Sequence, residues 1–377
     1  MKCLKLIIIY VCRVFLRLFW FIPIKKTRIY FSADRGTGIR CNPFYIFRYM
    51  QKHYGAKYEY IWEYDGTSKI KDIICVRPRS LKNVYYQLTS KVLISNDGFG
   101  SFLPKRKNQL FINTWHGGGA YKKSGIDFIT DQHSVDLKIN QICGKQTDIF
   151  ISGCEKFSDV MSVAKMVSRN RFWEIGMPRN DFLIKGTEEN ISGKVRKYFD
   201  IDEEKKIVLF APTYRGEEKT ARFHSEIDVE KCVGALKKRF GGEWVFLMRK
   251  HHFVKTIEYK GCINASEYPN MQELLYATDV FITDYSSTIW DYSLTFKPGF
   301  LFTPDLKAYE CERSFYTLPQ TWAFPIALTN EELEKEILDY DIDKAKEKIL
   351  KHQEALGNKE TGNAAELICD KIINYTI

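Results

Sequence analysis

The chain has 377 residues, 45% of them hydrophobic and 28% charged, a globular composition that excludes a disordered or collagen-like protein. Because single cores rarely grow beyond roughly 250–300 residues, this length predicts two domains. Six of the ten surplus positive charges lie in residues 1–26, which contain no Asp or Glu, so the charge indicates a local anionic surface and no nucleic-acid partner.

The ten cysteines are scattered along the chain, and no two have C-x-x-C spacing. Neither a zinc site nor a disulfide framework is therefore predicted. Scattered reduced thiols are typical of a cytosolic protein, and this is the compartment that we expect.

Residues 1–26 combine apolar runs with basic side chains. On a helix, four of these basic residues share an arc of roughly 120°, namely Lys2, Lys5, Arg13 and Arg17. The opposite side is apolar and aromatic. The pattern predicts an amphipathic helix lying in the headgroup region of an anionic leaflet, its basic side toward lipid phosphate. The protein would then be peripheral to the cytoplasmic face of the cell membrane.

Three other interpretations of this segment stay open. About 20 apolar residues are enough for a transmembrane span, although two central arginines make crossing costly. A cleaved signal peptide lacks a small-residue cleavage site after Pro23. The segment could also be a hydrophobic helix packed on the protein's own core.

After residue 26, β-rich runs alternate with helical stretches. This alternation is typical of a mostly parallel sheet covered on both faces, and we predict a first domain over residues 27–180. The predicted strands are Thr27–Ala33, Tyr58–Tyr64, Lys91–Asn96, Leu110–Trp115 and Asp148–Ser152.

The turn-rich and polar segment from Gly176 to Glu204 predicts the connection to a second domain over residues 205–377. We therefore expect two similar α/β halves with a cleft between them and ligands at the carboxyl ends of the strands. The predicted strands are Lys206–Pro212, Trp244–Lys250, Val280–Asp284 and Gly299–Thr303, and the predicted helices are Asp228–Phe240, Met271–Ala277, Ser287–Phe296 and much of 330–375.

The segment from Asn113 to Lys122 follows a buried run and contains Trp115, His116 and three consecutive glycines. A glycine loop lets backbone amides approach phosphates closely. A histidine at its mouth is a candidate proton acceptor near neutral pH. The alternative is a strand-end histidine packed under its own loop.

Two strands of the second half end in cationic residues. Thr213 and Arg215 follow the first of them, and the guanidinium could bind a phosphate in bidentate fashion, unless it is a solvated loop arginine. Another apolar strand leads directly into the run from Arg249 to His252. The alternative there is a basic surface turn.

A third strand leads into Thr283-Asp284-Tyr285-Ser286-Ser287-Thr288, followed by a helical pattern. Hydroxyls and free amides at a helix start form an anion site. A helix N-cap explains one of these hydroxyls but not four. Asp284 is placed to hold a loop, a ribose hydroxyl or a histidine.

Five motifs in this order resemble the CDP-glycerol glycerophosphotransferase family, the teichoic-acid primases and polymerases of Gram-positive bacteria. The resemblance spans about residues 90–320. The motifs are Trp115-His116-Gly117, Gly176-x-Pro178-Arg179-Asn180-Asp181, Ala211-Pro212-Thr213-Tyr214-Arg215, Arg249-x-His251 and Thr283-Asp284-Tyr285-Ser286-Ser287.

The resemblance implies two Rossmann-type domains of the GT-B kind in a membrane-associated enzyme. An acceptor hydroxyl, lipid-linked or on a glycan, would attack the phosphorus next to glycerol in CDP-glycerol and release CMP, in teichoic-acid or capsular polymer synthesis. CDP-ribitol is the alternative donor, since its enzymes share the motifs. By position, His116 corresponds to the general base, and Arg249 with His251 to the element near the donor diphosphate. Thr283, Ser286 and Ser287 correspond to the phosphate-binding helix start.

The chemistry of the residues agrees with this implication. Phosphoryl transfer depends on positioning and charge stabilisation, with a base acting on the nucleophile. Arg215, Arg249 and His251 could neutralise the diphosphate. No carboxylate cluster requires a metal, and a loosely bound Mg²⁺ on the diphosphate is compatible with the sequence.

The sequence departs from the family pattern at two positions, one after His116 and one after the Arg249-x-His251 element. His116 is followed by Gly117, Gly118 and Gly119 where the family has Gly-Thr-Pro, and Lys122 completes this acceptor-side loop. His252 replaces the usual proline after the Arg249-x-His251 element, and no role is assigned to it. The length favours a short, primase-like or capsule-type transferase. The competing hypotheses are a nucleotide-sugar glycosyltransferase of the same architecture and a non-catalytic membrane scaffold.

Overall fold

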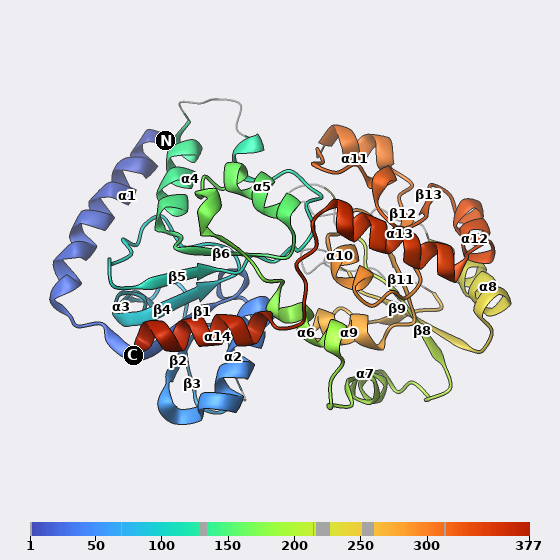
Figure 1. Cartoon of the computed structure of the whole chain (residues 1–377), viewed down its shortest axis with the longest axis horizontal. Helices are drawn as coiled ribbons and strands as arrows, with labels where there is room; N and C mark the ends of the chain where they lie inside the picture. The colour runs from blue at the N-terminus through green and yellow to red at the C-terminus, as the bar shows by residue number, and fades with distance from the viewer. Residues whose placement is uncertain are drawn as a thin grey trace. The chain divides into compact units, whose positions relative to one another are not determined.

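The computed structural model describes residues 2–68, 70–128, 134–213, 215, 227–250, 260–312 and 314–377. The chain forms two compact units, and in each of them helices cover both faces of a parallel sheet (Figure 1). The predicted α/β class is thereby confirmed. The first unit comprises Met1–Gly118, Lys123–Asp181 and Asn358–Ile377, and the second Gly119–Lys122 and Phe182–Gly357.

The sheet of the first unit has seven strands in the order β3-β2-β1-β4-β5-β6-β7, and every neighbouring pair is parallel. The order changes direction between β1 and β4, and open α/β sheets bind ligands at such a switch point. The strands are β1 Lys25–Ser32, β2 Glu59–Glu63, β3 Ile73–Val76, β4 Ser90–Ser95, β5 Leu110–Asn113, β6 Ile149–Ser152 and β7 Phe172–Glu174.

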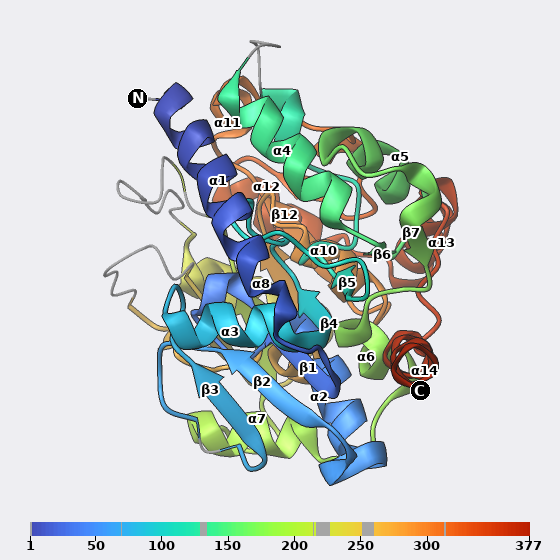
Figure 2. The ribbon, with the colours of Figure 1, turned by 90° about the vertical axis from the view of Figure 1, so that its left-hand side faces the viewer.

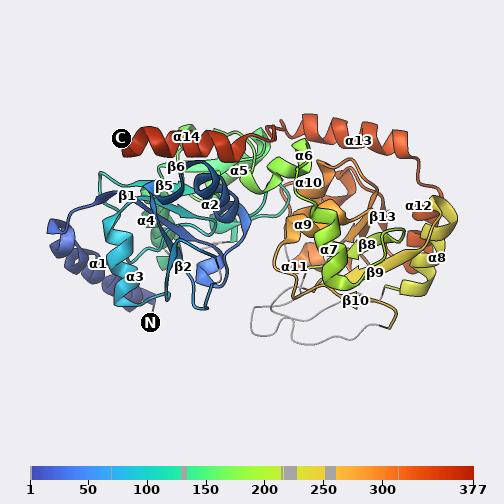
Figure 3. The same cartoon turned by 90° about the horizontal axis from the view of Figure 1, so that it is seen from below.

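Side chains of β1 alternate between the two faces of this sheet, as the pleat requires. Tyr30 belongs to a core cluster that includes residues of α3 (Leu81–Thr89) and the apolar side chains of Leu16, Phe19 and Trp20. Phe31 points to the other face and packs on Phe47 of α2 (Cys41–Tyr54). Figure 3 shows α2 and α14 (Ala364–Thr376) on one side of the sheet and α1 (Lys2–Arg17) and α3 on the other. The remaining helices of the unit are α4 Val135–Gln146 and α5 Glu155–Ala164.

The C-terminal helix α14 (Ala364–Thr376) packs in the first unit, although the sequence assigned residues 205–377 to one domain. The carboxylate of Asp181 accepts hydrogen bonds from the backbone amides of Ala364 (3.0 Å) and Ala365 (2.8 Å). Glu360, nearly fully buried, accepts from the amide of Met177 at 2.8 Å. These bonds and the buried face of α14 hold residues 358–377 to the first unit.

The sheet of the second unit has six parallel strands in the order β10-β9-β8-β11-β12-β13, which repeats the arrangement of the first six strands of the other sheet. Its switch point lies between β8 and β11. The strands are β8 Lys206–Phe210, β9 Trp244–Met248, β10 Ile263–Asn264, β11 Val280–Thr283, β12 Gly299–Phe302 and β13 Ile326–Ala327.

Helices cover both faces of this second sheet. The core cluster on one face includes side chains of α8 and α12, and on the other face Tyr292 of α10 packs on Phe281 of β11. The predicted connection over residues 176–204 contains two of the helices, and the units divide after Asp181. The helices are α6 Asp181–Lys185, α7 Ile191–Phe199, α8 Val229–Phe240, α9 Met271–Ala277, α10 Thr288–Ser293, α11 Leu306–Glu312, α12 Asn330–Leu338 and α13 Ile342–Ala355.

Helix α1 (Lys2–Arg17) lies beside α4 (Figure 2), but its basic residues do not all face outward as the sequence predicted. Arg13 turns inward, because its guanidinium donates to the carbonyls of Ser101 (2.8 Å) and Leu103 (3.1 Å). The outward side is apolar instead: Leu4, Ile7, Ile8, Tyr10, Val11, Val14, Phe15, Leu18 and Phe21 are all exposed. Among the described residues, no helix has the length and hydropathy needed to cross a membrane.

Candidate functional site

His116 follows β5 in the first unit, after a residue with left-handed backbone. Trp115 has φ 50°, a conformation that costs a non-glycine residue free energy and is common at functional sites. Its amide donates to Asn113 Oδ1 (3.0 Å), and Lys165 Nζ lies 4.3 Å from the centre of its ring. The turn therefore ends the strand, and these contacts of Trp115 fix the backbone that carries His116.

One hydrogen bond determines the tautomer of His116. Its Nδ1 lies 2.8 Å from the carbonyl oxygen of Asn96, and a carbonyl can only accept. Nδ1 therefore carries the proton and Nε2 carries the lone pair. The ring stacks on Trp115 with centroids 4.5 Å apart, and the side chain remains accessible to solvent. Nε2 is thus oriented as a proton acceptor.

The surroundings of His116 favour its neutral form. Although part of the ring is accessible, protein atoms crowd its other sides, and this desolvation lowers the pKa of the imidazole below its ordinary value. The hydrogen bond to Asn96 and the charges of Asp97 and Asp34 oppose the shift without reversing it. A neutral ring at pH 7 is the form that a general base requires, and the two carboxylates would stabilise the imidazolium that proton transfer creates.

The residues around His116 were not predicted as site residues from the sequence. Asp34 follows β1, and Asn96 with Asp97 follows β4, so they meet at the switch point of the sheet. The amide group of Asn96 donates to Asp34 Oδ1 (2.8 Å), while its Oδ1 accepts from the Asp34 backbone (2.8 Å). Polar residues directly after two strands were the signal that could have identified them.

The glycine loop after His116 is closely packed, and its contact with phosphates stays a prediction. Gly117 and Gly118 are buried, and neither they nor Gly119 have positive φ. At Gly119 a Cβ atom would lie 2.7 Å from the ring of Tyr121, so glycine is needed there for close packing. Lys122 forms a β-bridge with Phe315 and belongs to the second unit.

Asp284 connects two strand ends at the switch point of the second unit. Its Oδ1 accepts hydrogen bonds from the backbone amides of Thr213 (2.9 Å) and Tyr285 (2.6 Å). Its Oδ2 accepts from Thr213 Oγ1 and from Arg215 Nη1, each at 2.9 Å. The carboxylate is almost fully buried and accepts these four hydrogen bonds. Asp284 therefore holds the loop that carries Thr213 and Arg215, which is one of the three roles considered for it.

Arg215 does not extend toward solvent to meet a phosphate. Its guanidinium makes a bidentate pair with Asp305 (2.6 and 3.0 Å), donates to Asp284 (2.9 Å) and lies over the rings of Tyr285 and Tyr309. Burial lowers the pKa of the guanidinium, but the hydrogen bonds that it donates to both carboxylates, together with their charges, raise this pKa above the ordinary value. The structure thus places Arg215 in an internal ion-pair network, and its bidentate binding of a donor phosphate stays a prediction.

Of the predicted hydroxyl cluster, three residues remain partly accessible. Thr283 is fully buried, and its hydroxyl donates to the carbonyl of Ala211 at 2.7 Å. Ser286 and Ser287 are half-buried just before α10, and Ser286 Oγ lies 3.0 Å from Thr288 Oγ1. Thr288 is half-buried as well, so the hydroxyls of Ser286, Ser287 and Thr288 are the members of the predicted cluster that a ligand could reach.

Arg249 ties the end of β9 to a neighbouring loop. Its guanidinium donates to the carbonyls of Ala265 (3.1 Å) and Tyr268 (2.6 Å). The predicted residues His251 and His252 lie outside the described residues. Within the described ranges, no group of three or more His, Cys, Asp or Glu side chains could hold a metal ion.

The site and the fold can be compared with known proteins. A model of the CDP-glycerol:poly(glycerophosphate) glycerophosphotransferase family matches residues 14–374. A teichoic acid poly(glycerol phosphate) polymerase of Staphylococcus epidermidis is 28% identical over 371 residues, 93% of this chain and 51% of that protein. The Bacillus spizizenii protein of the same name is 28% identical over 319 residues, 80% of each chain. The chain thus spans about half the length of the first relative and four fifths of the second.

Solved structures agree with this assignment. The wall teichoic acid polymerase TagF matches with a TM-score of 0.81 and 26% identity, over 94% of this chain and 90% of that one. A UDP-GlcNAc 2-epimerase from Neisseria meningitidis, 11% identical with a TM-score of 0.52, covers 92% of this chain and 99% of that one and shares the fold alone. With its family match extending over residues 14–374, the chain belongs to the CDP-glycerol:poly(glycerophosphate) glycerophosphotransferase family.

Proposed function

We propose that the protein transfers glycerol phosphate, or a related polyol phosphate, from a CDP-polyol to an acceptor hydroxyl and releases CMP. The observation that carries the proposal is the state of His116. Its Nδ1 donates to the Asn96 carbonyl, which leaves the lone pair on Nε2; the residue is exposed, and desolvation of the ring lowers the imidazole pKa. Family membership supports the donor class, and relatives named for both glycerol phosphate and ribitol phosphate support either polyol.

In the proposed reaction, His116 Nε2 takes the proton of the acceptor hydroxyl as its oxygen bonds to the phosphorus next to the polyol. The bond from that phosphorus to the bridging oxygen breaks, and CMP leaves with the electron pair. Asp34 and Asp97 stabilise the imidazolium. Ser286 and Ser287 contribute donor contacts in the second unit, with Arg249 and His251 near the diphosphate. Arg215 acts as a positioning residue for the loop that carries Thr213. Any Mg²⁺ would be bound by the diphosphate of the donor.

Nucleotide release by the purified protein tests this proposal. CDP-glycerol, CDP-ribitol and UDP-sugars are offered separately, with membrane lipids as the acceptor source. We expect CMP from a CDP-polyol, and a loss of about 10²–10⁴-fold in kcat for His116→Ala, the usual size of general-base catalysis. Unchanged circular dichroism of the variant excludes the packed-histidine alternative. Release of UDP instead of CMP would assign the protein to the sugar transferases.

We also propose that the protein is peripheral to the cytoplasmic face of the membrane and that it acts in teichoic-acid or capsular polymer synthesis on a lipid-linked or glycan acceptor. The exposed apolar side of α1 supports the first part, since nine large apolar side chains lie outward on it and on the residues that follow. Lys5 and Arg17 are exposed on the same helix and suit anionic headgroups. The names of the relatives support the second part.

A further inference from the structure

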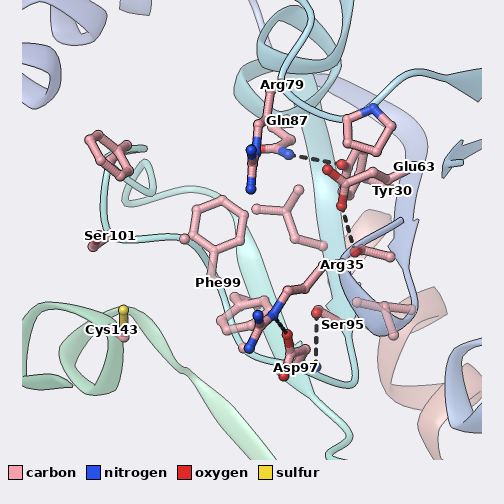
Figure 4. A pocket seen from close by; sticks show the side chains of 18 of the residues that line it. Tyr30, Arg35, Glu63, Arg79, Gln87, Ser95, Asp97, Phe99, Ser101 and Cys143 are labelled. Carbon is pink, nitrogen blue, oxygen red and sulfur yellow. Dashed lines mark hydrogen bonds and ion pairs between the residues drawn. The ribbon is translucent and has the colours of Figure 1, made fainter. Parts of the chain in front are cut away.

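The first unit contains a cavity of about 530 Å³ that none of the five sequence motifs reaches. Ser32, Glu63 and Ser95 lie in its wall at the carboxyl ends of β1, β2 and β4. Figure 4 shows Glu63 and Ser95 there. The cavity therefore lies at the switch point of the sheet, where open α/β sheets bind ligands. Its volume is within the range of roughly 300–1,000 Å³ typical of small-molecule sites.

The polar lining offers both a cation and hydrogen-bond acceptors. Arg79 is exposed with left-handed backbone (φ 61°), and within the described residues its guanidinium has no hydrogen bond or ion pair. Glu63 accepts hydrogen bonds from Ser32 Oγ (2.6 Å) and Asn83 Nδ2 (2.9 Å), both neutral donors. A carboxylate has room for more than two such bonds. Figure 4 shows the side chains of Arg79 and Glu63 on the cavity wall.

The cavity shares a segment with the proposed base. Asp97 lines the cavity and pairs with Arg35 at 2.6 Å, while the preceding residue, Asn96, holds His116 through its carbonyl. The charge of Asp97 also acts on the imidazole. A ligand bound here would therefore lie beside the proton acceptor of the first unit.

The opposite wall is aromatic and lies next to the N-terminal helix. Phe99 and Phe102 line the cavity, and Phe102 is 44% exposed. The loop that carries them is attached to α1, since Arg13 donates to the carbonyls of Ser101 and Leu103. The cavity thus combines a cation that has no partner in the described part of the chain, acceptors for hydroxyl groups and an apolar wall beside the outward apolar side of α1.

We propose that this cavity binds the polyol-phosphate end of the acceptor, an inference that rests on the proposed function. Arg79 pairs with the acceptor phosphate. Glu63 and Asp97 accept hydrogen bonds from its hydroxyl groups, and Phe99 and Phe102 cover its apolar side. A ligand with phosphate alone would place its charge beside Glu63, which has only neutral donors among the described residues, and a ligand with hydroxyls alone would leave Arg79 without an anionic partner. A polyol phosphate satisfies both.

Arg79→Ala tests the assignment, with Arg77→Ala as its matched control. Arg77 is a neighbouring exposed arginine that pairs with Asp65 and does not line the cavity. CMP release is measured with CDP-polyol while a water-soluble oligo(glycerol phosphate) is varied. We expect Arg79→Ala to raise the KM for this acceptor about tenfold or more, the usual cost of a lost charge-assisted hydrogen bond, with Arg79→Lys recovering part of it. Binding of CDP-glycerol, measured by calorimetry, should not change.

An unchanged acceptor KM in Arg79→Ala, or an equal loss in Arg77→Ala, would overturn the assignment. A weakened affinity for CDP-glycerol would assign the cavity to the donor instead. If the wild-type protein releases CMP from no CDP-polyol, the proposed function fails by itself. The assignment of the cavity is then tested separately, by calorimetric titration of oligo(glycerol phosphate) into the wild type and into Arg79→Ala. Equal affinities of the two proteins for this ligand would also overturn the assignment.

Discussion

At the scale of single residues, His116 determines how activity should depend on pH. Desolvation lowers the pKa of its imidazole, so the neutral base persists at a pH where an ordinary histidine is protonated. We expect kcat/KM for CMP release to stay on its plateau as pH falls through about 6.5, the ordinary histidine value, and to decline only below it. A pH–rate profile measures this, and a half-maximal rate at or above that value would contradict the lowered pKa.

Arg215 gives the second residue-scale prediction. Arg215→Ala would leave Asp284 and Asp305 facing each other in a buried place, and breaking such an ion pair typically costs about 3–5 kcal/mol. We therefore expect a large fall in the unfolding free energy, measured by urea denaturation. Arg169→Ala, which removes the more exposed ion pairs of Arg169 with Asp159 and Glu174, is the control and should change stability by about 1 kcal/mol or less. Unchanged stability with a raised donor KM would restore the phosphate-binding role predicted from the sequence.

At the scale of elements, α1 should attach the protein to membranes through its apolar side. Val11 and Val14 are 62% and 61% exposed, so replacing both by Asp should leave thermal stability unchanged and abolish sedimentation with anionic vesicles. Leu81→Asp, at a 90% exposed position in α3, is the control. Equal sedimentation of the double variant would refute the proposal. Point variants are preferable to deletion of residues 1–26, because Leu16, Phe19 and Trp20 pack against the core.

Helix α13 should make the second unit sensitive to acid. His352 is buried with its Nε2 3.0 Å from the hydroxyl of Tyr121, and burial lowers its pKa to about 4. The unfolded chain binds a proton at this histidine near pH 6.5, whereas the folded chain binds it only near pH 4. The contribution of neutral His352 to the unfolding free energy is therefore fully present above pH 6.5 and is lost as pH falls toward 4. The loss is on the order of 3 kcal/mol.

His352→Gln should remove this part of the pH dependence. The measurement compares the unfolding free energies of variant and wild type between about pH 4 and 7. Carboxylates titrate in both proteins and cancel in the difference. A difference that does not vary with pH would show that His352 contributes no acid sensitivity.

Strand prediction from the sequence succeeded inside the sheets and failed at their edges. The interior strands β1, β2, β4, β5 and β6 of the first unit and β8, β9, β11 and β12 of the second all overlap predicted runs. The four edge strands, β3, β7, β10 and β13, were missed. An interior strand of a parallel sheet is buried on both faces and needs a continuous apolar run, whereas an edge strand of two to four residues carries little such signal.

At the scale of the whole molecule, the chain does not divide at one point. Residues 119–122 belong to the second unit and residues 358–377 to the first. Composition along the sequence revealed the turn-rich connection near Gly176 but not the return of the C-terminal helix. That return depends on the bonds of Asp181 and Glu360 across about 180 residues of sequence, and no local pattern marks them.

The sequence by itself determined the alternation of strands and helices, the place of His116 at a strand end and the family to which the motifs belong. These features follow from local apolar runs and from motifs whose residues lie close together in the sequence. Only the tertiary structure decided which groups meet. Asn96 reaches His116 in the first unit, and Asp305 reaches Arg215 in the second, because parallel strands of one sheet bring the loops after their carboxyl ends to the same edge. The tautomer of His116, the internal pairing of Arg215 and the cavity beside Asp97 were therefore not predictable from the chain alone.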